Sequence, residues 1–134
     1  TVFLTVTDSD KPAAMGIAAQ LHDLGFRVVA TRGTASAIKR MGIPVETINK
    51  IQDGSPHVRD WIDNGEVDLV INTPTGTAAR SDGYEIRRAA VARGVPCVTT
   101  LAGGMAAARA IRAARLADPP VISLQELHAN GVVA

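Results

Sequence analysis

The sequence predicts an α/β domain of three layers, in which a parallel five-stranded sheet is flanked by helices. Five short apolar runs alternate along the 134 residues with segments whose apolar side chains recur at helical spacing. These runs are continuously apolar, as strands covered on both faces are. A glycine follows four of the helical patterns, where a left-handed cap is expected. Repeated strand–helix–glycine–strand units are typical of parallel βαβ folds.

The strands are predicted where the apolar runs are too short for helices. They fall in the ranges 2–6, 28–30, 45–48, 69–71 and 97–98. Helices are predicted between them from apolar side chains that share one helical face. The residues concerned are Ala14, Ile17, Ala18, Leu21 and Leu24, then Ala35, Ile38 and Met41, then Val58, Trp61 and Ile62. The caps that end these patterns are Gly25, Gly42, Gly65 and Gly94.

The last part of the chain is predicted to contain two further pieces of structure. Residues 101–115 are rich in alanine and favour a helix. After Pro119 and Pro120, "VISLQELHA" is expected to be a short strand or extended piece that runs into a last helical turn. No linker, repeat or low-complexity tract divides the sequence, so one domain over residues 1–134 is expected.

Composition excludes several classes of protein. Hydrophobic residues make up 46% and charged residues 20%, which argues against a disordered tail, and no apolar run is long enough for a membrane helix. A net charge of +1 gives no footprint for nucleic acid. The single cysteine, Cys97, excludes an internal disulfide, and the three histidines lack the spacing of metal ligands. We therefore expect a soluble, cytoplasmic domain without a metal, and the start at Thr1 suggests an excised piece of a longer chain.

Polar residues gather where the predicted strands end. In an open parallel sheet, ligands bind beyond the carboxyl ends of the strands. Hydroxyls and glycines that lead into helices there supply donors and the positive end of a helix dipole, which suit a phosphate group, and two lysines add full charges. Ordinary helix capping by threonine explains many of the same residues equally well. The residues are Thr5, Lys11, Thr31, Thr34, Lys50, Asn72, Thr73, Thr75, Thr77, Arg80 and Thr99.

Other residues also have two interpretations. His57 follows Ser55–Pro56 at a helix start and is more typical of a cap or a surface residue than of a catalyst. Gly103 and Gly104 serve either close helix–sheet packing or anion binding. Cys97 lies in an apolar strand and is interpreted as a small buried hydrophobe.

Catalytic motifs are scarce. The sequence contains neither the G-x-S-x-G elbow nor the P-loop, and no cysteine–histidine pair in a suitable context. A response-regulator function would use Asp8 and Asp10, but it also needs an acceptor aspartate after the third strand, where Asn49 and Lys50 stand. The sequence therefore predicts a binding module.

Several ordered motifs resemble one family almost end to end. The segments "ATRGTA", "NK" followed by "DGSPH", "GEVDLVINTPTG", "IRRAAV", "TTLAGG" and "VISLQELH" resemble the carboxy-terminal allosteric domain of the carbamoyl phosphate synthetase large subunit. The resemblance implies the methylglyoxal-synthase-like α/β fold. It also implies a regulatory role, in which a nucleotide effector of the UMP or IMP type binds this domain.

The resemblance also implies roles for particular residues. Effector-binding positions match Thr5, Lys11, Thr31, Thr34, Lys50, Asn72 and Thr73, and a contact near an ornithine site matches Thr99. Where some members have a hydroxyl and two arginines, this chain has Pro74, Thr77 and Ala78, so Thr75, Thr77 and Arg80 are the candidates for replacing them as phosphate partners. Which effector binds therefore stays open.

The family implies partners and cofactors as well. These are the synthetase domains of the same parent chain, the glutaminase small subunit and an interface between copies, with no nucleic acid or membrane. No cofactor is expected in this domain, whereas ATP and Mg²⁺ or Mn²⁺ are expected in the parent chain, a ligase that makes carbamoyl phosphate from glutamine, bicarbonate and ATP for arginine and pyrimidine biosynthesis. The alternative is a stand-alone enzyme of the methylglyoxal synthase type. That family places catalytic aspartates near Ser55 and at Thr75, where this chain has no carboxylate, so proton abstraction lacks its base.

Overall fold

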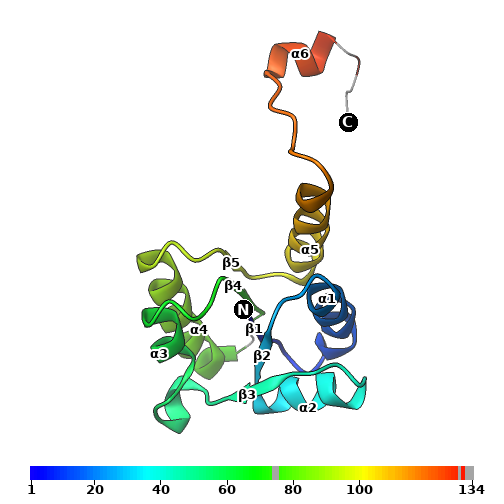
Figure 1. The fold of residues 1–134 in the computed structure, drawn as a ribbon. Helices are drawn as coiled ribbons and strands as arrows, with labels where there is room; N and C mark the ends of the chain where they lie inside the picture. The colour runs from blue at the N-terminus through cyan, green and yellow to red at the C-terminus, as the bar shows by residue number, and fades with distance from the viewer. Residues whose placement is uncertain (74–75, 130, 132–134) are drawn as a thin grey trace.

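Five parallel strands form one sheet in the order β3-β2-β1-β4-β5 (Figure 1). The computed structural model describes residues 1–73, 76–129 and 131, with side chains in all of these except residues 76–81. The predicted fold class is confirmed. The strands are β1 (Val2–Thr5), β2 (Val28–Thr31), β3 (Glu46–Ile48), β4 (Leu69–Asn72) and β5 (Cys97–Val98).

Helices connect the strands and cover both faces of the sheet (Figure 1). They are α1 (Lys11–Asp23), α2 (Arg32–Arg40), the short 3₁₀ turn η1 (Ile51–Asp53), α3 (Val58–Asp63), α4 (Gly76–Ala92), α5 (Leu101–Leu116) and α6 (Leu124–Ala129). None of the helices in the described part of the chain combines the length and the apolar character that crossing a bilayer requires.

Alternate residues of the central strands enter two separate cores. Val2 and Leu4 of β1 pack with α1 and α2, whereas Phe3 between them packs with α3 and α4 on the other face. Nearly all of these side chains are fully buried. Burial on both faces explains why the strands are continuously apolar in sequence.

The four predicted glycine caps are confirmed, because Gly25, Gly42, Gly65 and Gly94 have φ angles between 66° and 85°. Strand ends differ from the prediction by one residue. The strands β2 and β4 continue into Thr31 and Asn72 because the backbone ladder does not depend on an apolar side chain, and Thr5 pairs with Asn72 across it. The C-terminal segment runs extended into α6, as one of the expected alternatives had it.

The glycine pair at the start of α5 allows this helix to lie close to the sheet. A Cβ atom on Gly103 would lie 2.6 Å from Cγ1 of Val98, and one on Gly104 would lie 3.1 Å from Cδ1 of Ile17. Close packing therefore requires both glycines, which favours the packing interpretation over anion binding.

Two glycine-to-alanine substitutions are expected to change stability in opposite directions. Gly103→Ala forces Val98 to move and should lower the free energy of unfolding by about 1–3 kcal/mol. Gly16→Ala, in the exposed middle of α1 with nothing near the added methyl group, should raise it by about 0.5–1 kcal/mol. Urea denaturation of both variants measures this, and a Gly103→Ala variant as stable as the parent would contradict the packing role.

Candidate functional site

The site lies where the chain diverges from the middle of the sheet. Strands β1 and β4 are neighbours, but the chain continues from β1 toward β2 and from β4 toward β5. The helices that follow, α1 and α4, cover opposite faces (Figure 1). Such a divergence leaves room beyond the carboxyl ends of the strands, where ligands of open α/β sheets bind. A cavity of about 260 Å³ opens at this place.

Polar groups from several strand ends line the cavity together with apolar side chains. Five of the predicted residues line it, namely Thr5, Thr31, Lys50, Asn72 and Thr73. Ile51, Val58 and Ile86, from η1, α3 and α4, form its apolar part. Convergent polar groups beside a smaller apolar surface are compatible with a site for a small polar ligand.

Threonine hydroxyls tie the loop after β1 to its neighbours. Oγ1 of Thr34 accepts a hydrogen bond from the backbone N–H of Val6 at 3.3 Å, and Oγ1 of Thr73 accepts one from the N–H of Thr7, also at 3.3 Å. The hydroxyls of Thr5 and Thr31 are 3.2 Å apart. Each hydroxyl that accepts from the backbone still has a proton to donate.

Helix capping does not account for two of these threonines. Thr31 occupies the N-cap position of α2, but its side chain makes no capping hydrogen bond, and it faces Thr5 instead. Thr34 lies inside the first turn, is buried and bonds to the loop after β1. The capping interpretation is therefore wrong for both side chains.

Asn72 is the most unusual residue of the cavity. Its side chain is 3% exposed, and its Nδ2 atom is buried without a hydrogen-bond partner among the described residues. An unsatisfied buried donor costs about 1–3 kcal/mol, so such groups are rare unless something else satisfies them. A ligand acceptor in the cavity would provide that partner.

Charged groups surround the mouth of the cavity. Lys50 and the carboxylates of Asp8 and Asp82 line it. Lys11 donates a hydrogen bond to Asp8; this contact and the positive charge of Lys11 lower the pKa of Asp8, and the charge of Lys50 lowers it further. The sequence does not single out Asp82 for the site, because only the packing of α4 brings it to the strand ends.

Lys11 also lies beside the start of α2. A Cβ atom on Gly33 would lie 3.2 Å from Nζ of Lys11, so the ammonium group stands next to the first turn of that helix. A cation is unfavourable at this end of a helix, where the backbone N–H groups already carry partial positive charge. The Asp8 carboxylate offsets part of this repulsion, and an anion bound between the ammonium group and the helix would relieve the rest.

The remaining predicted residues are not all brought to the cavity. Thr99 is exposed between β5 and α5 and does not line it. Of the possible phosphate partners and the departures, Pro74 and Thr75 lie outside the described residues, as do the side chains of Thr77, Ala78 and Arg80. No cluster of three or more metal-ligating side chains occurs in the part of the chain that the structure describes.

A hydrogen-bonded loop carries Lys50 and Val58 to the cavity. His57 caps α3, with Nδ1 accepting from the N–H of Asp60 at 3.4 Å, while the Asp60 carboxylate accepts from the N–H of His57 at 2.9 Å. Asn49 donates to the carbonyl of Gly54 across the same loop. The interpretation of His57 as a capping residue is confirmed.

Cys97 is half-buried against the apolar core between the sheet and the helices α3 and α4, and this burial raises the pKa of its thiol.

The parallel sheet order, the helices on both faces and the cavity at the strand ends together define an open α/β domain. Residues 13–99 match the family model described as MGS-like domain, and the chain therefore belongs to the family of MGS-like domains.

Curated relatives extend the similarity beyond that region. The chain is 48% identical over 128 residues to the carbamoyl phosphate synthase large chain of Gemmatimonas aurantiaca, with 96% of this chain and 12% of the relative covered. It is 50% identical over 131 residues to the same protein of Ralstonia nicotianae, with 97% and 12% covered. It is 47% identical over 129 residues to the "Carbamoyl phosphate synthase large chain, C-terminal section" of Methanopyrus kandleri, with 96% and 24% covered. The chain thus spans about an eighth of the full large chains it matches.

The capping box of α3 is expected to depend on Ser55. The Ser55 hydroxyl donates to the Asp60 carboxylate at 2.5 Å and is the main cause that lowers the pKa of Asp60, ahead of the His57 N–H. Ser55→Ala should therefore raise the pKa of Asp60 toward the ordinary carboxyl value. The lowered pKa of Asp60 stabilises the folded protein at pH values above the pKa that this carboxyl has in the unfolded chain. This stabilisation is lost as the pH falls through the pKa of Asp60 in the folded protein. On acidification below about pH 4, the Ser55→Ala variant should therefore lose less stability than the parent.

An NMR titration of the Asp60 carboxyl carbon measures this change. Ser36→Ala is the matched control, because Ser36 is also exposed and its hydroxyl donates to the Arg32 carbonyl on α2. The same Asp60 pKa in the parent and in Ser55→Ala would contradict the role of this hydrogen bond.

Proposed function

We propose that this chain is the allosteric, nucleotide-effector-binding domain of the large chain of a glutamine-hydrolysing carbamoyl phosphate synthetase. The observation that carries the proposal is the buried Nδ2 atom of Asn72, which has no hydrogen-bond partner among the described residues, in the cavity that Thr5, Thr73 and Lys50 also line. An amide donor, hydroxyl donors and an ammonium group together suit the oxygens of a phosphate. Similarity to named large chains supports the choice of parent protein.

The two ends of a nucleotide would meet different groups in this proposal. The phosphate would lie near Lys50, Lys11 and the first turn of α2, where Asp8 offsets part of the positive charge. Asp82, on the α4 side of the cavity, offers a carboxylate acceptor that suits the hydroxyl groups of a sugar. A nucleoside monophosphate of the UMP or IMP type has both a phosphate and a sugar diol.

The parent enzyme would make carbamoyl phosphate from glutamine, bicarbonate and ATP in the cytoplasm, for arginine and pyrimidine biosynthesis. ATP with Mg²⁺ or Mn²⁺ would bind in its synthetase domains, and the glutaminase small subunit would be a further partner. Thr99, away from the cavity, would serve an ornithine-linked contact instead. The effector would act by favouring one of two arrangements of this domain against the synthetase domains, and coupling of this kind is typically about 1–3 kcal/mol.

Calorimetric titration with UMP and with IMP at low ionic strength tests the site. We expect one of them to bind with micromolar affinity and Lys50→Ala to weaken it at least several-fold, because the variant loses a charge-assisted phosphate contact. Lys39→Ala is the control, since Lys39 lies on α2 outside the cavity and contacts Thr47. Equal affinity in the Lys50 variant and the parent would contradict the site.

The alternative, an enzyme of the methylglyoxal synthase type, gains one supporting observation. Asp8 and Asp82 bring carboxylates to the cavity, although Ser55 carries none. The hydrogen bond from Lys11 lowers the pKa of Asp8 and makes it a weak base, so we expect no turnover of dihydroxyacetone phosphate in a colorimetric assay for methylglyoxal. Methylglyoxal formation that is lost in Asp8→Asn would overturn the regulatory assignment.

A further inference from the structure

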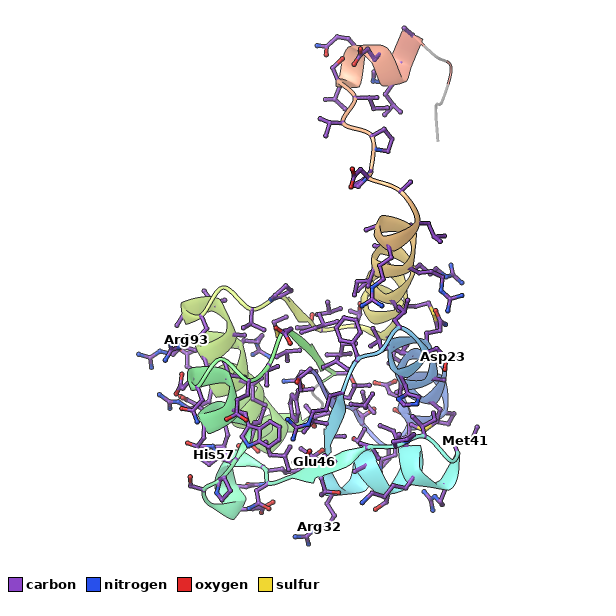
Figure 2. The ribbon with its side chains drawn as sticks, viewed as in Figure 1. Asp23, Arg32, Met41, Glu46, His57 and Arg93 are labelled. Atoms are coloured by element: carbon purple, nitrogen blue, oxygen red, sulfur yellow. The ribbon has the colours of Figure 1, made fainter. Side chains whose placement is uncertain are left out.

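The last part of the chain stands apart from the domain. Residues 117–129, here called the C-terminal arm, extend beyond α5 and end in α6 (Figure 1). Large apolar side chains along it are exposed to solvent: Val121 is 100% exposed, Leu124 70% and Ile122 51%, and Leu116 at the root is 83% exposed. Figure 2 shows that the side chains of the arm project from a segment that lies away from the other helices and strands. Contiguous apolar exposure of this kind marks an interaction surface.

The arm has a defined shape despite its isolation. A six-residue helix is normally unstable in water. Here Ser123 and Glu126 form a capping box, in which the Glu126 carboxylate accepts from the Ser123 N–H at 2.8 Å and the Ser123 hydroxyl accepts from the Glu126 N–H at 3.2 Å. Pro119 and Pro120 hold the preceding segment extended. An extended segment followed by a capped helix is preorganised for docking in a groove.

The arm leaves the domain at the edge where the strands begin. At its root, Arg115 donates to the Leu24 carbonyl and stacks 5.7 Å from the ring centroid of Phe26. The backbone carbonyl of Arg27, the residue after Phe26, accepts a hydrogen bond from the N–H of Val2 at the start of β1. The arm and Thr1 therefore share one edge of the sheet, opposite to the cavity.

The comparisons indicate what covers the arm. The match to the Ralstonia nicotianae large chain covers 131 of the 134 residues and therefore includes the arm. The same match spans 12% of that relative, so most of such a large chain lies outside the region that this chain matches. The similarity to large chains thus includes the arm, and the remainder of a large chain is the surface that we expect to cover it.

We propose that the C-terminal arm docks into an apolar groove on the remainder of the carbamoyl phosphate synthetase large chain and fastens this domain to it. This inference rests on the proposed parent protein but not on nucleotide binding. Val121, Ile122 and Leu124 fill the groove. The acidic residues of the arm are Asp118 and Glu126. Charge complementarity therefore favours a groove whose rim carries basic residues and no acidic residues.

Two other occupants are distinguishable. This domain has its own apolar groove of about 580 Å³ beside the root of the arm, lined by Phe26, Val28, Pro44 and Val45 among others. The arm could cover that groove in its own chain or in a second copy. Either contact would form in the isolated 134-residue chain, whereas docking on the synthetase domains needs the full large chain.

Hydrogen exchange measured by mass spectrometry tests the proposal. We compare residues 121–129 in the 134-residue chain and in the full-length large chain that contains it. Exchange should be at least about ten-fold slower in the large chain, because docking protects these amides. The double variant Ile122→Asp, Leu124→Asp, made in the large chain, should restore fast exchange in the arm and leave the exchange of β1 and β4 unchanged. Gln125→Asp is the matched control, since it adds charge at an exposed polar position of α6.

Each other outcome overturns the proposal. Equally fast exchange of the arm in the 134-residue chain and in the full-length large chain would show that the arm docks nowhere. Slow exchange in the 134-residue chain at all concentrations would assign the arm to its own groove, and slow exchange that increases with concentration would assign it to a second copy. Calorimetry with UMP and IMP reports independently on the cavity, so a failure of effector binding and a failure of arm docking are separable.

Discussion

The divergence of the chain at β1 and β4 is the constraint on which the site depends. Because α1 and α4 follow these neighbouring strands on opposite faces of the sheet, a cavity remains beyond the carboxyl ends of the strands, as the described residues show. The backbone in that space cannot find partners in the ladder alone. The N–H of Thr73 reaches the carbonyl of Thr5 at 3.0 Å, and the next N–H groups of the loop after β1 reach the hydroxyls of Thr34 and Thr73. Threonines are therefore needed there to hold the loop, before any ligand binds.

Loop support does not explain everything at this edge. The Thr34 and Thr73 hydroxyls satisfy backbone groups and lower the free energy of the fold, but the amide nitrogen of Asn72 has no such partner among the described residues. Lys11 likewise lies against the positive end of α2. A buried amide donor without a partner costs about 1–3 kcal/mol. The charge of Lys11 is already offset in part by its ion pair with Asp8. An anion with several oxygens would interact favourably with both the amide and the ammonium group, so one ligand accounts for the two together.

The fold could be predicted from sequence because its determinants are local. Buried parallel strands are continuous apolar runs, and Gly25 and Gly94 end the helical patterns before them in the left-handed conformation that glycine adopts readily. The polar residues at the strand ends could be assigned to one edge for the same reason. Their contacts could not be predicted, because the pair Thr5–Thr31 and the position of Asp82 depend on how distant segments pack. Periodicity also could not show that Val121 and Leu124 are uncovered, since an apolar pattern states which residues are buried together but not whether a partner is present.

The two ends of the sheet have different chemistry, and the distance between them is short. Strand β1 has four residues and rises about 3.3 Å per residue, so Thr5 in the cavity and Val2 at the opposite edge are separated by about 10 Å. The side chains between them, Phe3 and Leu4, are fully buried in the two cores. Close-packed cores transmit a displacement instead of absorbing it. Under the proposed function, an effector that moves the carboxyl ends of β1 and β4 would therefore act directly on the edge of the sheet from which the C-terminal arm extends.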